Sequence, residues 1–230
     1  DLQAVQEMMT SQKLAAVPVV NEGGILKNVL VWSDVFSEDS LPEQFDLKLP
    51  VLVMAGGKGT RLDPFTKILP KPLIPVGEKP IIELIMDQFS EFGCKKFFLT
   101  VNYKGKMIQS YFDHADDKYN VKFVWEEEFL GTAGSMKNAA PMIDAPHFFV
   151  SNCDILIRAD YNDIYKFHLE NDNDISVIGS MQHISVPFGV LETKNGGTLT
   201  EIVEKPELDF LANTGMYLVK SNVVEHIPAE

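Results

Sequence analysis

The sequence has few of the features that mark disulfide-rich, membrane or nucleic-acid-binding proteins. It has only two cysteines, Cys94 and Cys153, so we expect no disulfide framework and a reduced, cytoplasmic protein. No apolar run approaches the roughly 20 residues of a membrane span, and we expect no signal peptide at the start. Positive charge is scarce: 20 lysines and arginines face 33 acidic residues, a net charge of −13. We therefore expect neither a nucleic acid nor a membrane as partner.

Histidine offers no recognisable chemistry either. The five histidines show no metal-ligand spacing and no pairing with a nucleophile, so we expect structural or surface roles. The 230 residues, 45% of them hydrophobic, suffice for one full domain and a small extra piece. The chain opens at Asp1 rather than at methionine, and we expect that the N-terminus has been cut.

The hydrophobic pattern predicts three segments. Residues 1–37 are expected to form a helix, a strand over 17–20, a turn over 21–24, a strand over 29–32 and a further start at Ser33-Asp34. Residues 38–50 are expected to form a linker. From residue 51 strands and helices alternate, which predicts an α/β fold: a mostly parallel twisted sheet with helices on both faces. From Ile175 onward the pattern is rich in strands and predicts a β-excursion over one end of the sheet. The strands expected are 51–55, 96–101, 121–125 and 147–151, and the helices are 79–92, 104–113, 132–140 and 160–169.

The most informative stretch is a glycine-rich loop directly after the apolar run 51–54. Its nucleotide-binding candidates are Ala55, Gly56, Gly57, Gly59 and Thr60. Three glycines in four positions let the backbone turn sharply and bring its N–H groups against a ligand. The spacing matches neither the P-loop pattern nor the dinucleotide fingerprint. The loop is therefore predicted to hold the phosphates of a nucleoside triphosphate with help from basic side chains, although an ordinary solvated turn is the alternative.

Two basic residues complete the predicted phosphate site. Arg61 offers a planar fork for two phosphate oxygens, and Lys71 offers a compact charge between Pro70 and Pro72, which stiffen its backbone. A locally cationic loop in an acidic chain favours a compact anion as the ligand. The alternative for Lys71 is a solvated loop lysine.

An aspartate is predicted to bind magnesium at the same edge of the sheet. Asp154 follows an apolar strand, so it lies beyond a strand's carboxyl end like the glycine loop. Mg²⁺ accepts one or two carboxylates together with phosphate oxygens. A helix cap is the alternative role of such an aspartate.

A second loop is predicted to read the base. Glu126 follows the strand that ends at Trp125. Gly131 and Gly134 are expected to let a flat base lie against the backbone, and Thr132 is expected to open the next helix. A carboxylate accepts well from the N1–H and N2–H₂ donors of guanine, whereas uracil or thymine offers one donor. This favours GTP, with a solvated acidic face as the alternative.

A third group of residues is predicted to bind a sugar phosphate. A carboxylate and an amide suit sugar hydroxyls, and Lys205 could neutralise the phosphate as part of the catalytic set. The sugar-binding candidates are Gly189, Glu204, Asn213 and Thr214.

Taken in order, these motifs resemble the sugar-1-phosphate nucleotidyltransferase family from Val51 to about Pro228. The form Leu130-Gly131-Thr132-Ala133-Gly134 resembles the mannose-1-phosphate guanylyltransferase branch more than the thymidylyl or uridylyl branches. The resemblance implies a Rossmann-like, GT-A-like fold. It implies an Mg²⁺-dependent reaction of an NTP, with GTP favoured, and a hexose or amino-hexose 1-phosphate for glycan precursors. It also implies a possible homo-oligomer.

The remaining observations concern departures from that family. Cys153 stands where relatives usually have glycine before the metal aspartate. The family's second metal aspartate is expected past Glu230, so the domain over residues 51–230 is expected to be C-terminally incomplete. Residues 1–37 resemble part of a CBS repeat, with Val31 where a hydroxyl residue is usual. A non-catalytic subunit that senses nucleotide, a uridylyl, cytidylyl or thymidylyl transferase, and a pure CBS energy sensor are the alternatives.

Overall fold

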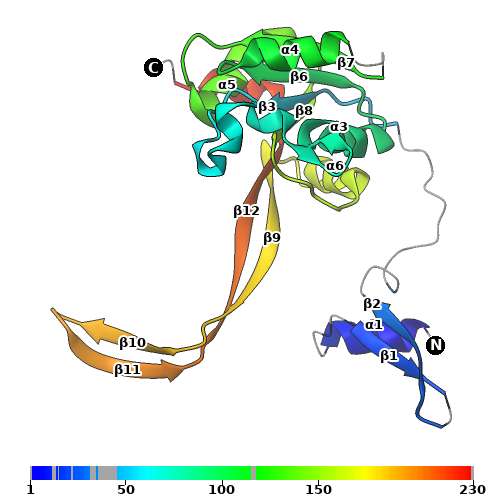
Figure 1. Cartoon of the computed structure of the whole chain (residues 1–230), viewed down its shortest axis with the longest axis vertical. Helices are drawn as coiled ribbons and strands as arrows, with labels where there is room; N and C mark the ends of the chain where they lie inside the picture. The colour runs from blue at the N-terminus through cyan, green and yellow to red at the C-terminus, as the bar shows by residue number, and fades with distance from the viewer. Residues whose placement is uncertain are drawn as a thin grey trace. The chain divides into compact units, whose positions relative to one another are not determined.

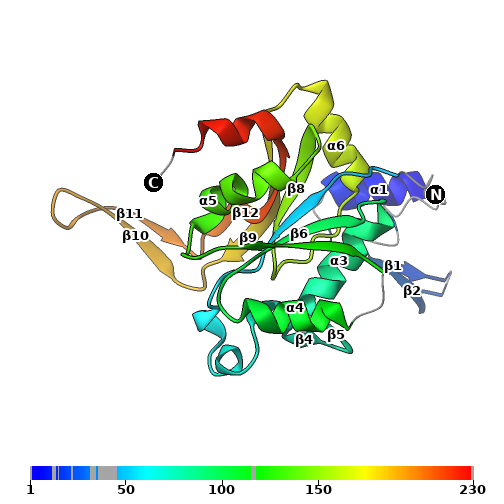
Figure 2. The same cartoon turned by 90° about the horizontal axis from the view of Figure 1, so that it is seen from above.

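The structure, a computed structural model, describes residues 2–11, 14, 16–21, 23–31, 35, 46–114 and 118–228. The chain divides into two compact units, Asp1–Glu43 and Gln44–Glu230 (Figures 1 and 2). The division falls within the segment 38–50 that the sequence predicts as a linker. Within the described ranges, no helix is long and apolar enough to cross a membrane.

The first unit contains one helix and one β-hairpin. Helix α1 (Leu2–Ser11) precedes strands β1 (Ala16–Val20) and β2 (Leu26–Val31), which pair antiparallel. The Asn21 side chain closes the turn, because its Oδ1 accepts from the backbone N–H groups of Gly23 and Ile25. Strand β2 begins at Leu26 rather than at the predicted residue 29, since pairing with β1 already starts at Leu26. Trp32 and the predicted start at Ser33-Asp34 lie outside the described residues.

The second unit is built on a six-stranded sheet in the order β7-β6-β3-β8-β12-β9. The strands β7, β6, β3 and β8 run parallel, and β12 pairs antiparallel with both β8 and β9. This confirms the predicted mostly parallel sheet. The strand bounds are β3 Val51–Met54, β6 Lys96–Val101, β7 Asn120–Trp125, β8 His147–Asn152, β9 Ile175–Ser185 and β12 Glu207–Lys220.

Helices pack on both faces of this sheet, as Figure 2 shows. One face buries side chains of α3 (Ile81–Glu91), α4 (Gly105–Asp113) and α6 (Tyr161–Glu170) against Val51, Val53 and Phe97. The other face packs α5 (Gly131–Ala139) and the 3-10 helices η4 (Ala140–Met142) and η5 (Ser221–His226) against Leu52 and Phe98. The strands β3, β6 and β8 are therefore covered on both sides, which explains their largely apolar sequence, whereas the edge strand β7 keeps Asn120, Lys122 and Trp125 exposed.

The helix bounds differ from the predicted ones by one or two residues. Helix α3 begins at Ile81 because Lys79–Pro80 form the short strand β5, which pairs with β4 (Pro75–Val76). Helix α6 begins after Asp160, whose carboxylate accepts from the N–H groups of Asn162 and Asp163. Such a cap satisfies donors that a helix leaves open at its first turn.

Strands β9 and β12 continue beyond the sheet as a two-stranded ribbon, which ends in the hairpin of β10 (Gly189–Lys194) and β11 (Thr198–Glu204) (Figure 1). The ribbon extends away from the sheet, whereas the sequence predicts an excursion over its end. The physical reason is the uninterrupted pairing of the two strands from Glu207 with Ser185 to Asn213 with Gly179. The register shifts between Asn213 and Met216, so a β-bulge stands where the ribbon leaves the sheet.

Candidate functional site

A cavity of ≈ 370 Å³ lies at the carboxyl ends of the parallel strands. It is lined from three directions: by the loop after β3, by the loop between β7 and α5, and by the end of β8. The cavity brings together most of the residues predicted for phosphate, base and metal. They are Gly56, Gly57, Gly59, Arg61, Lys71, Glu126, Gly131, Thr132 and Asp154.

The two other predicted loop residues, Ala55 and Thr60, flank the cavity lining. Ala55 is fully buried, and its N–H group donates to Thr100 O at 3.0 Å, so it continues the strand pairing. Thr60 is exposed and begins the 3-10 helix η1 (Thr60–Leu62), which also carries Arg61. Ala55 therefore anchors the start of the glycine loop to the sheet, and Thr60 begins the short helix that carries Arg61.

Gly59 is the residue that folds the glycine loop back on itself. Its φ of 68° lies in the left-handed region, where a side chain is strained. A Cβ at this position would lie 2.9 Å from Thr66 Cγ2 and 3.0 Å from Lys71 Cβ. Thr66 Oγ1 in turn donates to Gly59 O at 3.1 Å. The loop therefore packs closely against the segment that carries Lys71, and both reach one cavity.

The predicted phosphate and metal residues form an ion pair. Lys71 Nζ lies 2.5 Å from Asp154 Oδ2, with 25% and 39% of the two side chains exposed. Lys71 begins the 3-10 helix η3 (Lys71–Leu73), and the extended Pro70 sets its direction. Each charge is thus balanced by the other, and each remains open to a competing partner from the cavity.

The donor set fits magnesium only together with a ligand. In the part of the chain that the structure describes, no group of three or more histidines, cysteines or acidic residues could hold a metal. Asp154 contributes one carboxylate to the cavity. Since Mg²⁺ accepts one or two carboxylates plus phosphate oxygens and water, Asp154 suits an ion shared with a bound phosphate.

Glu126 is a buried carboxylate that faces this cavity. Its backbone is fixed twice: its N–H donates to Val101 O at 3.0 Å, and its carbonyl accepts from Asn102 Nδ2 at 2.7 Å. The residue is 8% exposed. Glu126 Oε1 is buried and has no hydrogen-bond partner among the described residues. Burial raises the pKa of this carboxyl, while the Ser135 side chain acts in the opposite direction.

Gly56 lets the glycine loop approach that carboxylate. A Cβ at Gly56 would lie only 3.0 Å from Glu126 Oε2. The main chain of the glycine loop at Gly56 and the Glu126 carboxylate are therefore neighbours, with no side chain between them. A ligand in the cavity can contact both at once.

The second glycine-rich loop starts helix α5. Gly131 has a φ of +65°, and no atom would lie within 4 Å of an added Cβ, so its open side is free for a ligand. Gly134 differs from the prediction that it too leaves room for a base. A Cβ there would lie 2.7 Å from Leu130 Cβ. Gly134 therefore serves the packing of Leu130.

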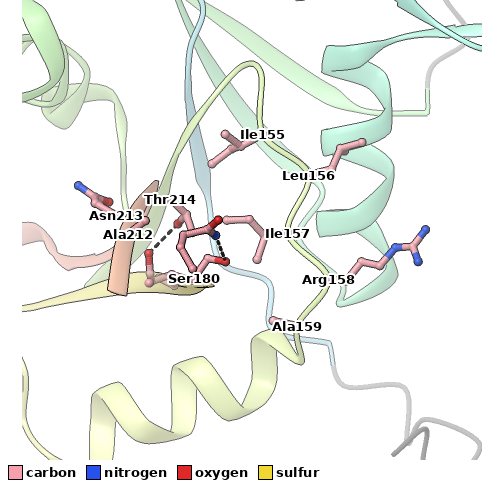
Figure 3. A pocket seen from close by; sticks show the side chains of 12 residues that line it. Ile155, Leu156, Ile157, Arg158, Ala159, Ser180, Ala212, Asn213 and Thr214 are labelled. Carbon is pink, nitrogen blue, oxygen red and sulfur yellow. Dashed lines mark hydrogen bonds between the residues drawn. The ribbon is translucent and has the colours of Figure 1, made fainter. Parts of the chain in front are cut away.

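Two predicted sugar-binding residues lie in the β-bulge of β12, where their side chains bond within the protein. Asn213 Oδ1 accepts from Gly215 N and Nδ2 donates to Tyr217 Oη, both at 2.9 Å. Thr214 Oγ1 donates to Ile178 O at 2.6 Å. Both residues line a second cavity of ≈ 580 Å³, between the loop 155–159 and the ribbon. In Figure 3 the Asn213 side chain points away from that of Thr214.

The other predicted sugar residues lie at the hairpin end of the ribbon. Gly189 and Glu204 are paired across β10 and β11. Lys205 follows with a left-handed φ of 47°, and its N–H donates to Phe188 O at 3.2 Å. None of the three lines the ≈ 370 Å³ cavity. The structure thus unites the phosphate, base and metal candidates and leaves the sugar candidates on the ribbon.

The cavity also contains residues that the sequence analysis did not assign. They are Met54, Thr100, Phe129, Leu130, Ser135, Asn152 and Cys153. Ser135 could have been found, because it lies four residues after Gly131 and so on the same face of α5. Thr100 could also have been found near the end of its strand. Phe129 carries no pattern that predicts its place, although its half-exposed ring lies 4.9 Å from Lys58 Nζ.

Comparison with protein families gives a match over nearly the whole second unit. Residues 50–229 match the family described as nucleotidyl transferase. A mannose-1-phosphate guanyltransferase of Yarrowia lipolytica is 33% identical over 184 residues, which are 76% of this chain and 50% of that protein. A mannose-1-phosphate guanylyltransferase catalytic subunit beta of Drosophila pseudoobscura pseudoobscura is 29% identical over 76% of this chain and 49% of that protein. The chain spans about half the length of these curated relatives.

Solved structures give a consistent result. HddC from Yersinia pseudotuberculosis is 30% identical, with a TM-score of 0.62 over 79% of this chain and 80% of that chain. The same protein complexed with GMP-PN gives a TM-score of 0.60. A UDP-glucose pyrophosphorylase complexed with UDP-glucose is 21% identical, with a TM-score of 0.57 over 77% of this chain and 78% of that chain. This last likeness concerns the fold alone.

Proposed function

Since the chain belongs to the nucleotidyl transferase family, we propose that the protein joins an NTP and a sugar 1-phosphate into an NDP-sugar and releases pyrophosphate. GTP is the favoured nucleotide. The observation that carries this proposal is a single cavity that collects a glycine loop, two basic side chains and a buried carboxylate. The relatives named as guanyltransferases support it.

The triphosphate is assigned to the loop after β3. Gly56, Gly57 and Gly59 expose backbone that can approach phosphate oxygens, and Arg61 and Lys71 supply the charge. Lys71 would exchange its contact with Asp154 for phosphate oxygens, because a nucleoside triphosphate carries more negative charge than one carboxylate. The Asp154 carboxylate would then face a magnesium ion shared with the phosphates.

The base is assigned to the cavity wall at Glu126. Its buried Oε1 has no hydrogen-bond partner among the described residues, and an unpartnered buried acceptor is unfavourable. Guanine presents two adjacent N–H donors, whereas uracil and thymine present one donor between two carbonyl oxygens. The GMP-PN complex of HddC is consistent with a guanine nucleotide in this fold.

The reaction is an in-line displacement. A phosphate oxygen of the sugar 1-phosphate attacks the α-phosphorus, and the bond to the β-phosphate oxygen breaks as pyrophosphate leaves. The nucleophile is already an anion at neutral pH, so no general base is needed, and the protein aligns the groups and neutralises charge. Arg61 and Lys71 hold the triphosphate in this scheme. A bound magnesium ion would supply further charge neutralisation at the phosphates.

The sugar side of the site is assigned to the ribbon. Lys205 would neutralise the incoming sugar phosphate, and Gly189, Glu204, Asn213 and Thr214 would contact a hexose or amino-hexose. This part of the proposal requires Lys205 and Glu204 to meet the nucleotide cavity, which they do not line. The same proposal treats the first unit as part of a CBS module, on the strength of its helix and hairpin.

A pyrophosphate-release screen of the full-length protein tests the function. Four NTPs are each combined with a panel of sugar 1-phosphates and Mg²⁺. We expect release with GTP and one hexose or amino-hexose 1-phosphate. Release with UTP or CTP but not with GTP would overturn the base assignment. Saturable binding of GTP with no release for any sugar would indicate a nucleotide-sensing subunit instead.

A further inference from the structure

Lys104 connects the end of β6 with the loop after β3. It follows β6 in the sequence and is the N-cap residue of α4. Its Nζ donates to Thr66 O at 2.9 Å, across 38 positions of the sequence. Thr66 lies in the 3-10 helix η2 (Phe65–Lys67), within the same loop that carries Arg61 and Lys71. Neither the family match nor the relatives' names assign a role to Lys104.

The main chain at Lys104 has an uncommon conformation. Its φ of 55° and ψ of 25° lie in the left-handed region, which residues other than glycine rarely adopt. The turn is also tightly packed, because an added Cβ at the following Gly105 would lie 2.9 Å from Trp125 Cζ3. Strain of this kind persists where the surrounding structure requires it. The Lys104 ammonium group contacts the Tyr103 ring, 5.1 Å from its centroid, and donates to Thr66 O.

Thr66 relays the bond from Lys104 to the glycine loop. The residue is 2% exposed. Its hydroxyl lies within hydrogen-bond distance of Gly59 O, at 3.1 Å, and of Asp63 Oδ1, at 2.7 Å. Its Cγ2 packs against Gly59, where an added Cβ would lie 2.9 Å away. The Thr66 side chain therefore holds the loop together, and its carbonyl group, bonded to Lys104, fixes the loop to the end of β6.

Few polar contacts join this loop to distant parts of the chain. Its backbone hydrogen bonds are local and span three or four positions. Among the hydrogen bonds and ion pairs of the described residues, two connect residues 56–73 with distant residues. One is the bond from Lys104. The other is the ion pair of Lys71 with Asp154. In the proposed function Lys71 leaves Asp154 for phosphate oxygens, so the bond from Lys104 is the one that remains.

We propose that Lys104 is a positioning residue for the triphosphate: it holds the loop after β3 in place while Lys71 exchanges Asp154 for phosphate oxygens. This inference rests on the proposed function of the same cavity. Lys104 acts through Thr66 and Gly59 rather than on the nucleotide, because it is not among the described residues that line the cavity. A hydrogen bond from a charged donor is stronger than one between neutral groups. Its loss therefore loosens the loop that carries the phosphate-binding side chains.

The test compares the affinities of the full-length protein for GTP and GMP with Mg²⁺, measured by displacement of a fluorescent guanine nucleotide. The two ligands share the base, and only GTP carries the β- and γ-phosphates. Lys104→Met removes the donor and keeps an aliphatic side chain. It is expected to weaken GTP by about tenfold to a hundredfold, the equivalent of one hydrogen bond from a charged group. GMP is expected to change by less than about threefold, so the GTP-to-GMP affinity ratio falls.

Rescue and coupling distinguish positioning from a general structural effect. Lys104→Arg keeps a cationic donor for Thr66 O and is expected to recover most of the GTP-to-GMP ratio. In the Lys71→Ala background, Lys104→Met is expected to weaken GTP less than it does in wild type, because Lys104 acts in part through Lys71. Full additivity of the two losses, or an equal loss in Lys104→Arg and Lys104→Met, would contradict the proposal.

Lys106→Met is the matched control. Lys106 is an exposed lysine two positions later, in the first turn of α4, and its replacement removes the same charge. It is expected to leave the GTP-to-GMP ratio unchanged. Lys104→Gln, which is shorter than lysine and uncharged, serves where Lys104→Met fails to fold.

The proposal is overturned if the tested Lys104 variant keeps the wild-type ratio, if it weakens GMP as much as GTP, or if Lys106→Met lowers the ratio equally. Failure of the wild-type protein to take up any nucleotide would instead overturn the proposed function itself, and this inference with it.

Discussion

Lys71 Nζ lies 2.5 Å from Asp154 Oδ2, so the residues predicted for phosphate and for metal contact each other across one cavity. Lys71 comes from a loop stiffened by Pro70, and Asp154 comes from the end of β8, more than eighty positions later in the sequence. Both side chains line the cavity, where in the proposed function Lys71 would meet phosphate oxygens and Asp154 would meet a metal ion. In the proposed function, this ion pair would be exchanged for the phosphates and the metal when the nucleotide binds.

Removal of Lys71 tests this relationship. Lys71→Ala is expected to lower kcat/KM for pyrophosphate release by about a hundredfold or more, as for other lost charge donors at a transition state. Lys71→Arg should recover only part of it, because the guanidinium fork does not occupy the same point. Lys106→Ala, an exposed lysine of α4, is the control. Near-wild-type turnover in Lys71→Ala would contradict the assignment.

Gly215 connects the β-bulge with the nucleotide cavity. Its φ is +82°, and an added Cβ would lie 2.2 Å from Nδ2 of Asn152, which lines the cavity. Gly215→Ala is expected to destabilise the fold by about 1–3 kcal/mol and to weaken nucleotide binding by displacing Asn152. Thermal unfolding and nucleotide titration measure the two effects.

Gly196→Ala controls for backbone strain alone. Gly196 has a similar φ of +78° in the turn between β10 and β11, with no atom within 4 Å of an added Cβ. It should share the strain of Gly215→Ala and leave nucleotide binding unchanged. Equal nucleotide binding in the two variants would show that the contact with Asn152 has no part in the site.

The parallel sheet, its helices and the positions of the phosphate and metal candidates at its edge follow from local sequence patterns. Alternating apolar runs predict the parallel strands and their helices within two residues, because strands buried on both faces need continuous apolar sequence. The place of Gly59, Lys71 and Asp154 at one cavity follows from their positions after strands or after Pro70, and their roles stay predictions. The direction of the ribbon that carries Gly189 and Glu204 was not predictable. It depends on the pairing of β9 with β12, two strands far apart in the sequence, and a local sequence pattern does not specify such pairing.

Asp87 makes the stability of the fold sensitive to acid. Burial acts to raise the pKa of Asp87, but hydrogen bonds from Lys118, Lys79 and Tyr119 outweigh it and lower the pKa to about 2. A lowered pKa stabilises the fold above the unfolded-state value of 3.8, and this contribution is lost as pH falls towards 2. We expect the free energy of unfolding to fall by about 1 kcal/mol over this range through Asp87, after allowance for solvent screening.

Asp87→Asn should remove that part of the acid dependence. It should cost only about 1 kcal/mol of folding stability at neutral pH, because the half-exposed Lys79 and Lys118 can be solvated by water instead. Glu170→Gln is the control. Glu170 lies 4.0 Å from Lys166 on the exposed face of α6, where an ion pair contributes little. Denaturant unfolding from pH 5 to pH 2 compares the two, and an unchanged acid dependence in Asp87→Asn would contradict the assignment.

The buried His168 leads us to expect a second loss of folding stability on acidification, at a pH closer to neutral than that of Asp87. The ring is fully buried; its Nδ1 lies 2.8 Å from Ser176 Oγ and its Nε2 lies 3.1 Å from His147 Nδ1. Burial lowers the pKa of His168, and the nearby His147 and Lys220 lower it further, against the opposite effect of Asp174 and Asp172. Burial likewise lowers the pKa of His147, together with Lys220.

A lowered histidine pKa destabilises the fold on acidification, because the unfolded chain takes up protons near pH 6.5 while the folded ring stays neutral. We therefore expect the free energy of unfolding to be constant above about pH 7 and to decrease between pH 6.5 and pH 5. His168→Gln should be less stable at pH 7.5 and should lose this decrease in part, whereas His114→Gln, exposed at the end of α4, should keep it. Denaturant unfolding at pH 7.5, 6.5 and 5.5 measures both. A wild-type stability that does not change over this range would show that the buried pair takes up its protons as readily as the unfolded chain does.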